Sequence, residues 1–241
     1  TVLVGKRKQM AAEGKSKFTL MTTEPVERLV FKMAVPTIIS MLVTALYNIV
    51  DTFFVGRIGN EATAGVGLVL PMMAVMHAFG FFFGMGSGNY ISRSLGAQET
   101  DKAETMAATG CFSALLFGVL ILALGLTFKG ALLYVLGARE TLLDALTVRC
   151  AGEYLTIILC GAPFLCVSCV MNNQLRFQGN AFFSMIGLVS GAVLNCVLDP
   201  IFIFALGLGV RGAAYATVLG QIASCALLYT RTLRSDRLKL H

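Results

Sequence analysis

Charged residues are scarce in this sequence, and tryptophan is absent. Only 13% of the 241 residues are Asp, Glu, Lys or Arg, whereas an ordinary soluble domain carries about 25%. Hydrophobic residues make up 56% of the chain, and the mean hydropathy is +0.78. These values exclude an ordinary soluble domain and predict a polytopic membrane protein.

Histidine is nearly as rare as tryptophan. The two histidines are His77 and the terminal His241, and the sequence has no H-E-x-x-H, G-x-S-x-G or P-loop pattern. We therefore predict that the chain is not an enzyme and holds no cofactor. His77 lies in an apolar stretch, which favours a packed polar side chain over a catalytic one.

The formal net charge of +6 raises the question of a nucleic-acid partner. However, no stripe of alternating basic and aromatic residues accompanies the charge. The basic residues instead gather towards the two termini, which is typical of the cytoplasmic flanks of membrane proteins. We predict contact with membrane lipid and no nucleic-acid partner.

Six apolar stretches are long enough to cross a bilayer, which takes about 20 residues. The expected spans cover residues 33–55, 67–91, 106–128, 154–174, 181–204 and 210–229. They predict an all-α unit over residues 29–230, between a polar, basic tail at 1–28 and a basic tail at 231–241, which we expect to mark a truncation. In the longest connection, residues 140–149 intersperse leucines with charges, as a short helix on the membrane surface would.

Lysine and arginine are divided unequally between the two sides of these spans. The two tails and the connections after the second and fourth spans hold 14 of them, and the remaining connections hold 5. The positive-inside rule therefore predicts a multi-pass protein of the cell membrane with both termini in the cytoplasm.

Two aspartates, Asp51 and Asp199, lie within otherwise apolar spans. A carboxylate at a bilayer centre costs about 2.5–3.5 kcal/mol on insertion scales, so such residues are rare and usually face a cavity. Tyr47 and Asn48 precede Asp51 by four and three residues, and Asn195 precedes Asp199 by four. This spacing predicts that each aspartate shares a helix face with a polar neighbour.

The predicted orientation assigns a depth to each of these side chains. Asp51 and Asp199 lie late in outward-running spans, whereas Tyr154 and Thr217 lie early in inward-running spans. All four therefore fall in the outer half of the membrane, together with the polar neighbours of the aspartates. We expect one polar layer built from four helices.

Such a layer can serve one of two kinds of chemistry. Its carboxylate, amide and hydroxyl oxygens are suited to Na⁺, a hard cation. Alternatively, an aspartate removed from water can take up and release a proton near neutral pH. As a purely structural role, interhelical hydrogen bonds contribute about 0.6 kcal/mol each, which fits the amide and hydroxyl groups better than two separate aspartates.

Several motifs, taken together, resemble one family of transporters. They are LYNIVDTFFVGR at 46–57, RSLGAQ at 93–98, RFQG at 176–179, NCVLDPIF at 195–202 and GAAYAT at 212–217. In this order, over roughly residues 25–235, they resemble the bacterial multidrug and toxic compound extrusion (MATE) transporters, and most closely their DinF-like branch. Each motif is weak by itself, and the ordered set is specific.

The resemblance implies cation-coupled efflux of small amphipathic, often cationic, compounds. Matched residue by residue, it implies a coupling site for Na⁺ or H⁺ at Asp51, Asn195, Asp199 and Thr217. Tyr47 and Tyr154 match tyrosines of the same hydrogen-bond network, beside Asn48. Asn172 matches a substrate-contact position.

The chain departs from the family pattern in one respect. Family members have about twelve spans in two six-helix lobes, whereas this sequence supplies one N-terminal lobe. The partner is therefore expected to be a second six-helix lobe or, with the same geometry, a second copy of the chain. Two alternatives stay open: a flippase for lipid-linked oligosaccharides from the same superfamily, which would favour a cationic cavity, and a non-transporting subunit or inactive half.

Overall fold

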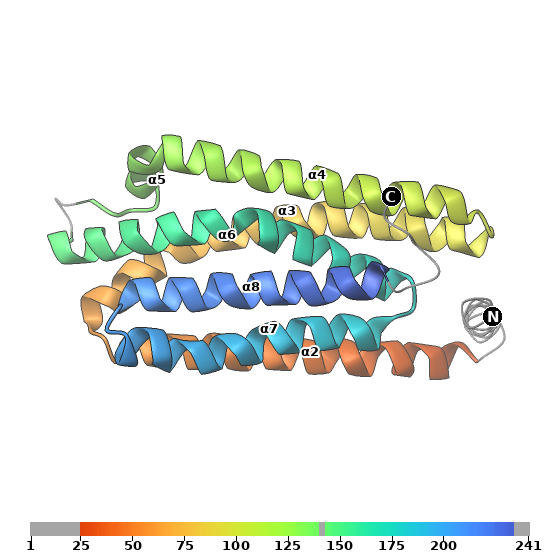
Figure 1. Ribbon diagram of the computed structural model, residues 1–241, viewed down its shortest axis with the longest axis horizontal. Helices are drawn as coiled ribbons and strands as arrows, with labels where there is room; N and C mark the ends of the chain where they lie inside the picture. The colour runs from red at the N-terminus through yellow and green to blue at the C-terminus, as the bar shows by residue number, and fades with distance from the viewer. Residues whose placement is uncertain (1–24, 140–142, 234–241) are drawn as a thin grey trace, which may run out of the picture.

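The computed structural model describes residues 25–139 and 143–233, and this part of the chain is helical with no strand (Figure 1). The helices are α2 (Val26–Gly56), α3 (Asn60–Gly96), α4 (Thr100–Thr127), α5 (Lys129–Val135), α6 (Ala145–Phe177), α7 (Ala181–Pro200), the π-helix η1 (Ile201–Ala205) and α8 (Val210–Leu233). The predicted all-α fold is thus confirmed.

Six of these elements are long and apolar enough to cross a membrane, with η1 counted as the continuation of α7. Each overlaps one expected span, and most extend beyond it. The extra residues include charged ones, such as Glu27 and Arg28 at the start of α2 and Asp101 near the start of α4. Hydropathy marks only the residues inside the apolar core, whereas the helix continues into the polar membrane surface.

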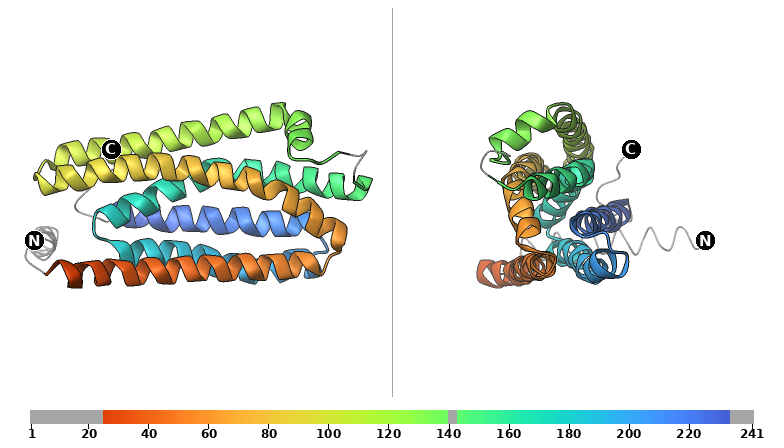
Figure 2. Two further views of the ribbon diagram at one scale, coloured as in Figure 1. Left: turned by 180° about the vertical axis from the view of Figure 1, so that it is seen from behind. Right: turned by 90° about the vertical axis from the view of Figure 1, so that its left-hand side faces the viewer.

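Helix α6 is the centre of the bundle. It packs against α3 and α4 on one side and against α8 on the other (Figures 1 and 2). Helix α7 packs between α8 and α2, so α2 lies at the edge. The most apolar window of α6 is 67% buried, compared with 6% for α2. The apolar side chains of α2 therefore face outwards along most of its length.

A short helix does lie in the longest connection, but earlier in the chain than expected. It is α5 at Lys129–Val135, whereas residues 145–149 begin α6, and residues 140–142 lie outside the described residues. The charges near 149 belong to an ion-pair network rather than to a surface helix. Arg149 Nε lies 2.9 Å from Glu153 Oε1 one turn later in α6, and Arg211 of α8 lies 2.7 Å from the same oxygen.

Helix α7 changes its hydrogen-bonding pattern immediately after Asp199. Pro200 has no N–H to donate, and the chain continues as the π-helix η1. There, Leu206 N donates to Ile201 O across 2.9 Å. Single π-turns of this kind occur often at functional sites. Gly207 and Gly209 then turn the chain into α8 with φ values of 64° and 54°, in the left-handed region that glycine adopts without strain.

Candidate functional site

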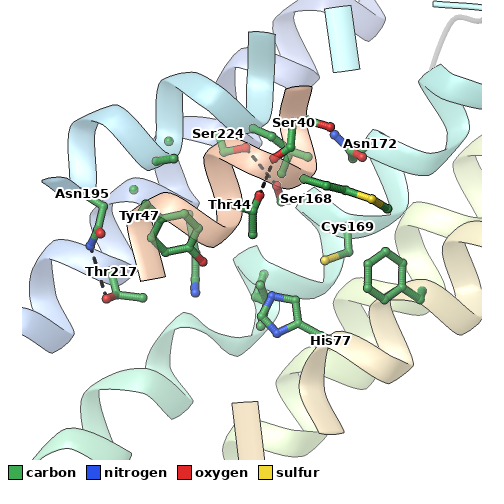
Figure 3. A pocket seen from close by; sticks show the side chains of 18 of the residues that line it. Ser40, Thr44, Tyr47, His77, Ser168, Cys169, Asn172, Asn195, Thr217 and Ser224 are labelled. Carbon is green, nitrogen blue, oxygen red and sulfur yellow. Dashed lines mark hydrogen bonds between the residues drawn. The ribbon is translucent and has the colours of Figure 1, made fainter. Parts of the chain in front are cut away.

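Asp199, near the end of α7, is fully buried, at 0% exposure. The Nδ2 atom of Asn195, one turn earlier in α7, lies 3.4 Å from Asp199 Oδ1 and also 3.4 Å from Thr217 Oγ1 in α8. Thr217 in turn donates to the carbonyl of Ala213. Figure 3 shows the contact between Asn195 and Thr217. The structure thus brings together the three predicted residues of α7 and α8.

Asp51 approaches this group from α2. It is partly buried, and it lies close enough to Asp199 and to Tyr154 of α6 to interact with them electrostatically. Across the described residues, no lysine or arginine lies within ion-pair distance of either aspartate. The four helices α2, α6, α7 and α8 therefore meet at a pair of acidic side chains without a basic partner.

Three oxygen atoms in this group are buried and accept no hydrogen bond. They are Asp51 Oδ1, Asn195 Oδ1 and Asp199 Oδ2. A buried polar atom without a partner is costly, so native proteins rarely keep one without a function. Oxygens of this kind can accept a hydrogen bond from water or ligate a cation, and the two carboxylates can also take up a proton. Na⁺ and H⁺ are the two coupling ions expected for this layer.

Of the other predicted side chains, the two tyrosines lie beside the acidic residues, whereas Asn48 lies apart from them. Tyr154 is 1% exposed, and its hydroxyl lies 4.0 Å from the sulfur of Met73. Tyr47 lies near Asp51 and turns towards the cavity (Figure 3). Asn48 is exposed, and its Nδ2 donates to the carbonyl of Thr44 in its own helix across 2.9 Å. The structure therefore leaves Asn48 outside the polar group.

A cavity of about 260 Å³ extends from this group between α2, α3, α6, α7 and α8. Tyr47, Asn195 and Thr217 line it near the acidic end, and the predicted substrate contact Asn172 lines it further along α6 (Figure 3). His77 of α3 also lines the cavity, with Nδ1 2.9 Å from the carbonyl of Met73. His77 thus has a hydrogen-bond partner in its own helix and also faces the cavity.

Much of the polar lining was not predicted from the sequence. The additional polar residues are Ser40 and Thr44 of α2, Ser168 and Arg176 of α6, and Gln221 and Ser224 of α8. A signal for them is present: residues 40, 44, 47 and 51 repeat at intervals of four, three and four, and so place one polar stripe on α2. Residues 217, 221 and 224 make the same stripe on α8.

Close contact between two backbones fixes the separation of α7 and α8 at the site. A Cβ atom added to Gly191 would lie 2.7 Å from the carbonyl oxygen of Gly220, and one added to Gly220 would lie 2.8 Å from that of Gly191. These glycines are one turn from Asn195 and Thr217. Their contact holds the two helices close enough for those side chains to meet.

Five of the six candidate membrane-spanning helices line a cavity, and Asp51 and Asp199 each lie one helical turn from a residue that lines it. This arrangement has the form of a membrane transport protein. The MatE family model matches residues 36–201, and the chain belongs to this family. The chain is 32% identical over 202 residues to the multidrug export protein MepA of Staphylococcus aureus (strain MRSA252), covering 83% of this chain and 44% of MepA. MepA of Staphylococcus saprophyticus is 31% identical over 204 residues, with 84% and 44% covered.

Solved structures agree with this assignment. A transporter of the MOP superfamily from Pyrococcus furiosus, described as having a binding pocket of reverse polarity, is 33% identical with a TM-score of 0.84, over 93% of this chain and 49% of its own. A MATE structure in the straight conformation is 31% identical, also with a TM-score of 0.84, over 93% and 49%. The chain thus spans about half the length of the relatives that it matches and corresponds to one six-helix lobe.

Proposed function

We propose that this chain is the cation-binding lobe of a transporter that exports amphipathic, often cationic, organic compounds in exchange for Na⁺ or H⁺. The observation that carries the proposal is the set of three unpartnered oxygens on Asp51, Asn195 and Asp199. Asn195 lines the cavity, and each aspartate lies one helical turn from a lining residue. A purely structural polar cluster would satisfy these atoms. An ion-exchange site leaves them available to an ion that comes and goes.

The roles of the residues follow from their positions. Asp51, Asn195, Asp199 and Thr217 supply oxygen atoms from three helices, which suits either Na⁺ coordination or proton exchange at a carboxylate. Tyr47 and Tyr154 border this group and support its geometry. Asn172 lines the cavity away from the carboxylates, where it would contact the body of a substrate.

The coupling cation and a positively charged substrate exchange because both compete for the negative charge of the same carboxylates. A bound cation neutralises the carboxylates and so removes their attraction for a positively charged substrate. By linkage, a substrate that prefers the ionised carboxylates lowers the affinity for the coupling cation by the same factor. Because Asp51 and Asp199 lie on different helices, occupancy of the site also changes the interaction between α2 and α7.

The complete transporter requires more than one such lobe. We propose that a second six-helix lobe, or a second copy of this chain, completes the substrate path, with both termini of this chain in the cytoplasm. A lobe that binds a cation without moving substrate would be the non-transporting alternative. Transport and binding must therefore be measured separately.

The test is transport by the purified chain in proteoliposomes with separately imposed Na⁺ and pH gradients. We expect one of the two gradients to drive efflux of a fluorescent organic cation from vesicles in which cross-linking shows paired lobes. Asp51→Asn should abolish the gradient dependence. The exposed substitution Asp101→Asn, in the first turn of α4, should leave it unchanged.

Two results would contradict the proposal. Efflux that is equally fast without either gradient would remove the coupling role of the carboxylates. Dye binding without efflux under any gradient, in vesicles with paired lobes, would favour the non-transporting subunit. Dye release on addition of Na⁺ or acid, measured on the same protein, reports the cation competition independently of transport.

A further inference from the structure

A groove lies between α2 and α7 on the face of these helices that points away from the polar cavity. It is lined by Ile39 and Val43 of α2 and by one face of α7 within residues 185–197, and no residue lines both the groove and the cavity. Ser190 is the one polar residue of this lining, and its hydroxyl already donates to the carbonyl of Gly187 across 3.0 Å. The groove is therefore suited to a hydrocarbon chain.

The length of the groove matches one leaflet of a bilayer. Residues 185 and 197 lie twelve positions apart on α7, which at 1.5 Å per residue is about 18 Å. The hydrocarbon core of a bilayer is about 30 Å thick, so that one leaflet contributes about 15 Å. Helices α2 and α7 begin at the same end of the bundle and run side by side (Figures 1 and 2). One acyl chain can therefore lie along the groove, with its headgroup at the end where both helices begin.

The face of α2 that lines the groove becomes basic towards this end. Residues 28, 32, 35, 39 and 43 follow one another at intervals of four, three, four and four, and so lie on one face of the helix. Val35, Ile39 and Val43 are apolar, whereas Arg28 and Lys32 are basic and exposed in the first two turns of α2. The apolar groove thus leads to two positive charges.

A third positive charge lies behind the same end of the groove. Arg176 of α6 donates from Nε to Ser184 Oγ of α7 across 3.1 Å and from Nη2 to Ser40 Oγ of α2 across 3.3 Å. These serines are the sequence neighbours of the groove residues Met185 and Ile39. Among the described residues, no carboxylate lies within ion-pair distance of Arg176. Basic groups between membrane helices on one side of a bilayer are suited to anionic lipid headgroups.

We propose that the groove between α2 and α7 is a binding site for an anionic phospholipid. One acyl chain lies in the groove, and the phosphate contacts Arg28 and Lys32, with the charge of Arg176 behind it. This site is separate from the cavity and does not depend on the proposed cation exchange. Because α2 carries Asp51 and α7 carries Asp199, a lipid that bridges these helices stabilises the packing that places the two aspartates together.

Ordinary contact with the bilayer makes different predictions, since every exposed apolar face of the bundle touches hydrocarbon without preference for a headgroup. The chain offers matched controls. Arg93 and Lys102 lie at the same end of the bundle but on α3 and α4, across the bundle from α7 (Figure 1). Val119 of α4 is 46% exposed, compared with 55% for Val193 in the groove.

The experiment titrates the purified chain in detergent with phosphatidylglycerol or phosphatidylcholine of identical oleoyl chains and counts bound lipid by native mass spectrometry. We expect the wild type to bind one phosphatidylglycerol in preference to phosphatidylcholine. The double substitution Arg28→Gln and Lys32→Gln should weaken binding of phosphatidylglycerol by about tenfold or more, because each basic residue at the membrane surface contributes about fivefold. Binding of phosphatidylcholine should not change.

Val193→Trp tests the chain-binding part, because the indole fills the groove. It should weaken binding of both lipids, whereas Val119→Trp should resemble wild type. The double substitution Arg93→Gln and Lys102→Gln removes the same net charge and should also resemble wild type. All of these positions are exposed, so circular dichroism should show an unchanged helix content in each variant.

Several outcomes would overturn the site. Equal binding of the two lipids by the wild type would indicate ordinary bilayer contact. The same loss in the Arg93 and Lys102 variant would assign lipid binding to the overall charge of this end of the bundle. Undiminished lipid binding by Val193→Trp would remove the groove from the site, and loss of a cross-linked dimer in that variant would assign this face to contact between two copies of the chain.

Discussion

Replacing Asp199 by asparagine is expected to abolish the stabilisation of the bundle by its coupling cation. Asp199 is fully buried, and its Oδ2 atom has no partner. A cation that binds only the folded bundle stabilises it by about 2.7 kcal/mol at a concentration of 100 times its Kd. The amide keeps the shape of the side chain and removes the charge, so most of the stabilisation by the bound cation should disappear.

The measurement is the melting temperature of the purified protein, titrated with NaCl against choline chloride at constant ionic strength, and separately with pH. The wild type should respond to one of the two titrations, and the response identifies the coupling ion. Asp101→Asn makes the same chemical change at an exposed position and should keep the full response. An Asp199→Asn protein with the wild-type response would remove Asp199 from the site.

The same substitution should not lower the stability measured without the cation. In the wild type, Asn195 Oδ1 is buried without a donor, and the new amide can donate to it. An unpaired buried charge is also removed. Asp199→Asn is therefore expected to fold at least as well as wild type, so that loss of the cation response cannot be attributed to misfolding.

The fold could be predicted from hydropathy because the bilayer imposes one strong constraint. Every spanning segment must satisfy its own backbone hydrogen bonds, and an apolar run of about 20 residues therefore indicates a helix. Helix ends could not be predicted in the same way, because α3 and α6 continue beyond the apolar core with polar residues. The short helix expected over residues 140–149 is wrong for a related reason: Arg149 belongs to α6 and pairs with Glu153 of the same helix, which also pairs with Arg211 of α8.

The acidic half of the site could be predicted because aspartate in an apolar span is conspicuous. Asn48 shows the limit of arguing from spacing. Successive residues turn by about 100° around a helix, so Tyr47 and Asn48 cannot both face one cavity although each lies about one turn from Asp51. The side of α2 that faces inwards depends on its packing against α7, which the spacing on α2 alone does not determine.

The part of the cavity lined by Ser40, Arg176 and Ser224 was missed because these residues are ordinary in sequence. Ser40 and Ser224 are small polar residues of a kind that membrane helices carry for packing, and Arg176 follows the predicted positive-inside pattern. Only the structure shows that Arg176 reaches Ser40, 136 positions away in the chain. The polar stripes on α2 and α8 would have indicated that the cavity continues beyond the aspartates.

Replacing Gly220 by alanine is expected to damage the cation site although Gly220 supplies no ligand. The added Cβ would lie 2.8 Å from the carbonyl oxygen of Gly191 and 3.3 Å from the Cβ of Asn195. The carbonyl belongs to the backbone of α7 and cannot rotate away like a side chain, so the two helices must separate. Overpacking of this kind costs typically about 1–3 kcal/mol.

The site is sensitive to this separation because its contacts are already long. Asn195 Nδ2 lies 3.4 Å from both Thr217 Oγ1 and Asp199 Oδ1, near the limit at which a hydrogen bond forms. A small outward shift of α8 would therefore break the link between the two helices. We expect Gly220→Ala to lower the melting temperature and to lose most of the cation response in the same titration.

The control is Gly86→Ala in α3, where an added Cβ meets nothing within 4 Å. This change should leave both quantities unchanged or raise the melting temperature slightly, because alanine favours a helix more than glycine does. A Gly220→Ala protein that melts lower yet keeps the full cation response would show that the site tolerates the separation. In that case the oxygens of α7 and α2 alone would bind the cation, and Thr217 would be a structural residue.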